Sequence, residues 1–171
     1  GFNLGAAGHD ILIVGTNLFI ITEDSGQEVR IYDIETPSSF NTGNFVASIN
    51  VPGNAKARAF AYYDDTLYVT AAEDTGESEI YSYDVSDLGS ISQLDDLNDP
   101  GSSFLDIRLL NGYAYLGSSM DTMELRVVDV FDPSDLEFAA GGGYNLTDTT
   151  DATSIAALGD YILVGRNQGD I

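Results

Sequence analysis

Residues 23–37 read EDSGQEVRIYDIETP, residues 73–87 read EDTGESEIYSYDVSD, and residues 121–135 read DTMELRVVDVFDPSD. Each copy opens on acidic residues, continues into a run rich in apolar residues, and closes that run with an aspartate. These aspartates are Asp33, Asp84 and Asp129. A phrase that recurs three times in 171 residues indicates a repeat architecture, in which each copy belongs to one supersecondary unit.

The repeat extends upstream of each phrase, and the start of a fourth copy follows the third. Short apolar runs lie upstream of the phrases, and their second residues are separated by steps of 49, 47 and 48 residues. These second residues are Leu18, Leu67, Ala114 and Ile162. The regular step predicts one structural unit for every 48 residues or so.

Each unit reads as short β-strands separated by turn residues. The first strand is ILIV, FAYY, DIRLL or SIAAL in the four copies, and we expect hairpin turns near Thr16, Asp65, Asn111 and Asp160. The pair Asn111-Gly112 is a strong signal for a two-residue hairpin. No stretch keeps apolar residues at helical spacing, so the sequence predicts almost no helix.

The strand that ends at each repeated aspartate is largely apolar on both faces, as in VRIYDI at residues 29–34. A strand buried on both faces lies between two layers, and four strands in about 48 residues match one propeller blade. The sequence therefore predicts an all-β fold, a β-propeller of four-stranded antiparallel blades, as one domain over residues 1–171. The expected repeats cover residues 10–52, 57–98 and 104–143, followed by a half blade at 152–171.

The segments NLFIITEDSGQEVRIYDIETP and GYAYLGSSMDTMELRVVDVFDPSD resemble the LVIVD-type repeats of bacterial and archaeal β-propeller proteins. The third copy matches best. The second departs from the pattern, with Ser82 in an apolar column and DLG where Asp-Pro is expected. The resemblance covers most of the chain, implies the propeller fold and a secreted or surface protein, and carries no catalytic motif.

Three units and a half do not close a ring, because closed propellers have at least four blades. The strand at residues 161–165 would expose an unpaired edge, which folded proteins avoid. We expect the rest of a longer chain, or another subunit, to complete the ring. The partner strand should run antiparallel and carry a pattern like LRVVDV.

The charge of the chain is extreme, with 28 Asp and Glu against 6 Lys and Arg and a net charge of -22. This field repels phosphate, which argues against partners such as nucleic acid or anionic membranes. No apolar run is long enough for a membrane-spanning helix. Three interpretations remain open: a halophilic protein with a salt-adapted surface, a calcium-binding extracellular protein, and an acidic secreted domain.

Few residues are candidates for chemistry. The chain has no cysteine, and His9 is its only histidine, which excludes a metal site built on imidazoles. We expect the acidic loops at residues 23–28 and 73–79 to be solvated. First-strand charges should line a channel or form ion pairs at its rim; these are Arg58, Asp106 and Arg108. The best calcium candidates, the only cofactor considered, are Asp95, Asp96, Asn98 and Asp99, because several oxygens meet within one turn.

The function that these features favour is a non-catalytic β-propeller scaffold or interaction module, extracellular or on the cell surface. Its expected partners are another protein, further blades of the same parent chain, or copies of itself. Two alternatives remain: an extracellular propeller enzyme or sugar-binding module whose site lies outside this segment, and a self-assembling filament or shell subunit. The repeated aspartates are expected to serve as turn residues.

Overall fold

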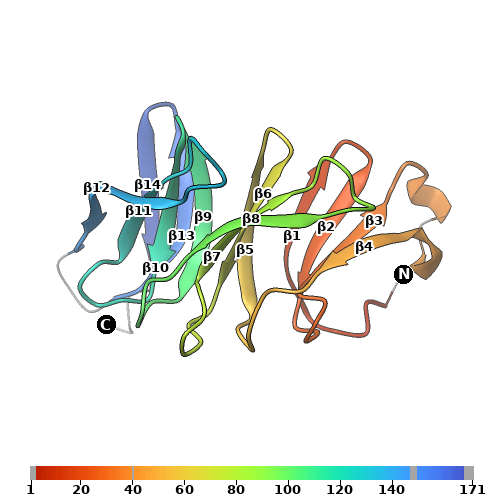
Figure 1. The fold of residues 1–171 in the computed structure, drawn as a ribbon, viewed down its shortest axis with the longest axis horizontal. Coiled ribbons are helices and arrows are strands. Elements are labelled where there is room, and N and C mark those ends of the chain that lie inside the picture. Colours follow the sequence, from red (N-terminus) through yellow and green to blue (C-terminus); the bar gives the residue numbers. More distant parts are fainter. Residues whose placement is uncertain (1–2, 40, 147–149, 168–171) are drawn as a thin grey trace.

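The structure is a computed structural model that describes residues 3–39, 41–146 and 150–167, and it consists of antiparallel β-sheets (Figure 1). The first blade contains β1 (Gly8–Val14), β2 (Asn17–Thr22), β3 (Val29–Asp33) and β4 (Phe45–Ile49), with short 3-10 helices at Pro37–Ser39 and Thr42–Asn44. The second contains β5 (Ala57–Tyr63), β6 (Thr66–Ala71), β7 (Ile80–Asp84) and β8 (Ser92–Leu97). The third contains β9 (Phe104–Leu110), β10 (Tyr113–Ser118), β11 (Leu125–Asp129) and β12 (Glu137–Tyr144). A half-blade contains β13 (Ala152–Leu158) and β14 (Tyr161–Arg166).

In every blade the strands pair with their neighbours in chain order, so each sheet is a simple antiparallel meander. The expected hairpins are confirmed at all four first turns. Asn111 and Gly112 have φ values of 53° and 79°, which is the left-handed backbone that a two-residue turn of this kind requires. The hairpins lie together along the upper edge of Figure 1.

The blades pack face to face around their first strands. Strands β1, β5, β9 and β13 contact one another in order, which places them at the inner side of the arc. One apolar core joins the first blade to the second, with Ile21, Val29 and Leu67 wholly buried. Another joins the second blade to the third. The prediction of an all-β fold built from propeller blades is therefore confirmed.

The repeated aspartates end the third strand of each blade and hold the turn after it. The side chain of Asp33 accepts a hydrogen bond from the Glu35 amide at 2.8 Å. Asp84 and Asp129 accept bonds from the amides two residues further on, at 2.9 and 3.0 Å. This is the geometry of an Asx turn, so the expected turn role is confirmed.

A second repeated acid was not recognised from the sequence as a structural element. Glu28, Glu79 and Glu124 directly precede the third strands and are 2%, 0% and 0% exposed. Each accepts a backbone amide hydrogen from the segment that crosses to the next blade, at 3.2, 2.6 and 2.7 Å. The expectation that the acidic loops at residues 23–28 and 73–79 are solvated is therefore wrong for Glu28 and Glu79. Their carboxylates turn inward because the crossing segment has amides that no strand pairs.

Candidate functional site

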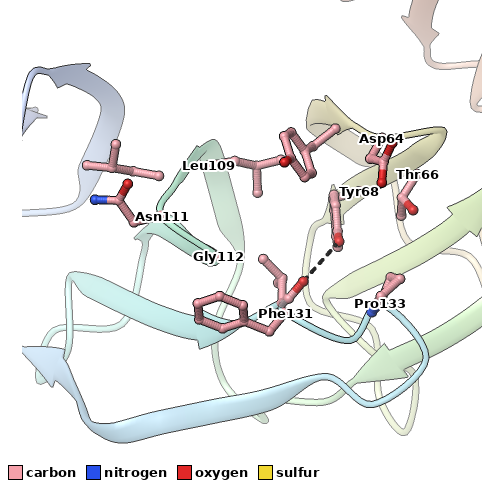
Figure 2. A pocket seen from close by; sticks show the side chains of 11 residues that line it. Asp64, Thr66, Tyr68, Leu109, Asn111, Gly112, Phe131 and Pro133 are labelled. Atoms are coloured by element: carbon pink, nitrogen blue, oxygen red, sulfur yellow. Dashed lines mark hydrogen bonds between the residues drawn. The ribbon is translucent and has the colours of Figure 1, made fainter.

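A hollow of about 460 Å³ lies between the second and third blades, at the edge that carries the first hairpins (Figure 2). Three segments form it: the β5–β6 turn, the β9–β10 turn, and the loop that follows β11. The residues that line it are Tyr63, Asp64, Thr66, Tyr68, Leu109, Leu110, Asn111, Gly112, Val130, Phe131 and Pro133. Most of these are apolar or aromatic; Asp64 and Asn111 come from the turns, and Thr66 begins β6.

Tyr68 forms one wall of the hollow. Its side chain is 2% exposed, and its hydroxyl donates a hydrogen bond to the Val130 carbonyl at 3.4 Å, as Figure 2 shows. Burial, together with the nearby charge of Asp132, raises the pKa of Tyr68 to about 12. The hydrogen bond from this phenol ties the second blade to the loop of the third.

Phe131 stands at the mouth of the hollow and is 70% exposed. One face of its ring lies against Gly112, where a Cβ atom would collide with the ring. The ring also makes a T-shaped contact with Tyr113, with the ring centroids 5.5 Å apart and an interplanar angle of 85°. The ring is thus held in position by the turn although most of it remains open to solvent.

Tyr63 forms the opposite lip and is also 70% exposed. The turn beside it carries two aspartates in left-handed backbone, Asp64 at φ 47° and Asp65 at φ 60°. The Tyr62 hydroxyl donates to Asp65 at 2.8 Å, and this bond raises the pKa of Tyr62. Asp64 is the carboxylate that lines the hollow, so the lip combines an exposed ring with negative charge.

Such an arrangement can bind a ligand that combines an apolar group with a polar or charged one. Its lining residues include one carboxylate, Asp64, and two phenols, Tyr63 and Tyr68. The apolar interior can receive an apolar or aromatic group, while Asp64 favours a cation or a hydrogen-bond donor beside it. The rings of Tyr63 and Phe131 provide large contact areas for the same ligand.

The four residues proposed for calcium lie at the junction of the second and third blades. Asp95 accepts the Leu136 amide hydrogen at 2.6 Å, and Asp96 accepts from Ser78 at 2.5 Å. Because they are consecutive in β8, their side chains leave opposite faces of the sheet.

The other two calcium candidates follow the end of β8. The Asn98 side-chain amide donates to the Glu77 carbonyl at 2.7 Å. Asp99 forms an ion pair with Arg126, in which Nη2 lies 2.8 Å from Oδ1 and Nε lies 2.8 Å from Oδ2. In the described ranges no cluster of three or more Asp, Glu or His side chains could hold a metal ion. The calcium site remains a prediction.

The predicted ion pair on the first strands is confirmed for Asp106 and Arg108, at 2.9 Å. The second oxygen of Asp106 accepts the Ile155 amide hydrogen at 2.7 Å, so this carboxylate also clamps the half-blade to the third blade. Arg58 is half-buried in β5. His9 forms a pair with Glu23 at 2.9 Å.

Comparisons with solved structures agree with this architecture. The computationally designed Ika4 protein matches with a TM-score of 0.68 at 14% identity, over 98% of this chain and 90% of its own. The designed Ika8 protein matches with a TM-score of 0.63 at 15% identity, over 93% of this chain and 42% of its own. GH43B of the Bacteroides ovatus xyloglucan PUL matches with a TM-score of 0.53 at 16% identity, over 95% of this chain and 36% of its own.

The fold is a β-propeller. Identities this low show the fold alone, and the chain spans less than half the length of Ika8 and of GH43B. A scan against protein-family models gives no match, and neither does a search of curated proteins. Among the residues described here, no helix is both long enough and apolar enough to cross a membrane.

Sequence reasoning missed the hollow of this propeller. Tyr63 and Phe131 belong to different repeats, and neither stands in a motif with known chemistry. The available signal was an aromatic residue next to turn aspartates, in YYDD at residues 62–65 and VFDP at residues 130–133. Only the packing of the second blade on the third shows that these two turns face one another.

Proposed function

We propose that this chain is a non-catalytic β-propeller interaction module of a secreted or cell-surface protein, and that it binds a protein partner at the hollow between the second and third blades. The observation that carries the proposal is the pair of exposed rings at its mouth. Tyr63 and Phe131 are each 70% exposed, beside an apolar interior. Aromatic residues in such positions are the usual anchors of protein interfaces.

The charge of the protein defines the partner further. The net charge is -22, and Asp64 lies in the lining of the hollow. A segment that places an aromatic or branched apolar side chain in the hollow, with Lys or Arg next to it, satisfies both features. The attraction between the charges raises the association rate more than it raises the affinity, and it weakens as salt increases.

The acidic residues that recur at the same positions in the repeats already stabilise the fold. Glu79 and Glu124 accept amide hydrogens at the crossings between blades. Asp84 and Asp129 accept amide hydrogens in turns. These contacts support binding rather than catalysis as the activity of this segment.

Selection from a displayed peptide library tests the proposal. The expected peptides carry an aromatic or branched apolar residue flanked by Lys or Arg, and they lose binding to the Tyr63→Ala and Phe131→Ala variants. Tyr144→Ala is the matched control, because Tyr144 is 58% exposed and lies outside the lining of the hollow. Peptides without this pattern, or peptides that bind the Phe131→Ala variant equally well, contradict the proposal.

Location and family belong to the same proposal. The acidic surface and the LVIVD-like repeats support a secreted or surface protein of that repeat family. Labelling intact cells of the source organism with an antibody against this chain tests the location. A signal that appears only after the cells are opened contradicts it.

A further inference from the structure

The loop at residues 130–136, which follows β11, carries Phe131 to the mouth of the hollow, and the loop after β7 is its counterpart in the second blade. The repeated aspartates Asp84 and Asp129 set the register of the two loops, because each accepts the amide hydrogen of the residue two positions later. In this register Ser86 occupies the position of Phe131. The exposed ring therefore belongs to one loop and is not a feature of the repeat.

Polar side chains of the second blade hold this loop on both sides of Phe131. The Tyr68 hydroxyl donates a hydrogen bond to the Val130 carbonyl, one residue before the ring (Figure 2). The Ser82 hydroxyl donates to the Pro133 carbonyl at 2.6 Å, two residues after the ring. Both donors are buried, so these bonds are made in the interface between the two blades.

Asp95 provides a third contact, at the end of the loop. Its carboxylate accepts the Leu136 amide hydrogen at 2.6 Å. Asp95 lies opposite Ser82 in the pairing of β7 with β8, and the Asp95 amide donates to the Ser82 hydroxyl at 3.0 Å. Tyr68, Ser82 and Asp95, called here the polar supports, thus bond the loop backbone at three points.

The first blade has apolar residues at the positions of the three polar supports. Their side chains form no hydrogen bonds, and they pack in or against the core between the first and second blades. Leu88 and Ile91, from the loop that carries Ser86, pack against the same core. The polar supports and the exposed ring therefore occur together at one junction. The strand pairing identifies the apolar counterparts as Phe19, Ile31 and Ala47.

We infer that the polar supports are positioning residues for the hollow: they hold residues 130–136, and this fixes the ring of Phe131 at the mouth. Apolar contacts are non-directional, whereas a hydrogen bond sets both a distance and an angle. A loop that loses a support spends less time with its ring in place, and the apparent affinity for a ligand falls in proportion. This consequence for binding rests on the proposed function, but the position of the ring can be measured without a ligand.

Nuclear magnetic resonance of Gly112 reports the position of the ring. A Cβ atom added at Gly112 would collide with the ring of Phe131, so one α-hydrogen of Gly112 points at that ring. The ring current shifts the resonance of a hydrogen held in this way. The native protein should show a shifted Gly112 signal, and Phe131→Ala should abolish the shift.

Variants of the polar supports should change this signal while keeping the native circular dichroism spectrum. In Asp95→Ala the loop loses one bond, and the Gly112 signal should move toward its value in Phe131→Ala. Ser82→Ala should act in the same direction, whereas Asp95→Asn keeps an acceptor oxygen and should retain the native signal. The control Asp96→Ala removes the neighbouring carboxylate of β8, which bonds Ser78 and not the loop, and should leave the signal unchanged.

The affinity for a peptide selected on the native protein is the second measurement. Loss of a hydrogen bond to a charged acceptor changes an equilibrium by about tenfold or more, so Asp95→Ala should weaken peptide binding by up to about tenfold, and Asp95→Asn should restore it. A Gly112 signal that stays native in Asp95→Ala and Ser82→Ala, or that moves equally in Asp96→Ala, overturns the inference. Native peptide affinity in Asp95→Ala despite a moved signal also overturns it. Failure to select any peptide contradicts the proposed function, and the Gly112 signal then decides the inference.

Discussion

Two substitutions of Glu79 should distinguish the effect of its hydrogen bond on stability from the effect of its buried charge. Its carboxylate is fully buried and accepts the Asp99 amide hydrogen at 2.6 Å. In Glu79→Ala this amide loses its acceptor in the interior, which costs about 1–3 kcal/mol of unfolding free energy. For a domain of this size the melting temperature should fall by roughly 2–12 °C, at about 2–4 °C per kcal/mol. Asp121→Ala, which removes one exposed acid, is the control.

The Glu79→Gln variant tests the charge. Burial raises the pKa of Glu79 in the folded protein, despite the opposing hydrogen bond from Asp99. Its contribution to stability is therefore complete at acidic pH, below the pKa of the unfolded chain, and is lost as the pH rises through the higher pKa of the folded protein. Glutamine keeps an acceptor oxygen but does not titrate. The stability of Glu79→Gln relative to the native protein should rise between pH 4 and pH 7, as measured by urea unfolding. A difference that stays constant or falls over this range refutes the reasoning.

Three further results are expected. Gly117→Ala should lower the unfolding free energy by about 1–3 kcal/mol, because the added Cβ would lie 2.6 Å from the Ala152 carbonyl oxygen of the half-blade; chemical unfolding that matches the native protein would show that the half-blade is not packed so closely. The melting temperature should rise markedly between about 0.01 M and 1 M sodium chloride, because the net charge of -22 is then screened; a flat profile would remove the support for a salt-adapted surface. Millimolar calcium at fixed ionic strength should give the same rise if Asp95, Asp96, Asn98 and Asp99 bind the ion, and equal melting temperatures with calcium and with magnesium would contradict that site.

The blades could be predicted from the sequence because their signals are local and repeated. Asn111-Gly112 determines its own hairpin, and an aspartate such as Asp129 bonds an amide two residues away. Both interactions are complete within a few residues, so a reading of adjacent positions finds them. The apolar pattern of the third strand in each blade likewise predicts that both of its faces are largely buried, as β3, β7 and β11 are.

The structural role of the carboxylates that accept hydrogen bonds from distant amides could not be predicted in this way. Glu79 bonds an amide 20 residues away, and Asp106 reaches an amide 49 residues away in the half-blade. In the sequence Glu79 looks like any other member of an acidic loop. Its burial depends on the direction of the chain after β8, which apolar periodicity does not specify.

The hollow could not be predicted from the sequence for the same reason. Tyr63 and Phe131 are 68 residues apart in the chain, and each lies in a stretch whose composition is that of an ordinary turn. The two residues face a common space only because the second blade packs on the third through Tyr68 and Val130. Sites between repeats are therefore harder to recognise than the repeats themselves.

A double-mutant cycle between Phe131 and the apolar anchor of a selected peptide tests the central claim most directly. The affinity is measured by titration calorimetry for the native protein and for Phe131→Ala, each with the native peptide and with its anchor replaced by alanine. If the anchor occupies the hollow, the two changes are coupled by about 0.5–3 kcal/mol, as expected for side chains in contact. Additive losses, with no coupling beyond the error, would show that the peptide binds elsewhere and would contradict the account.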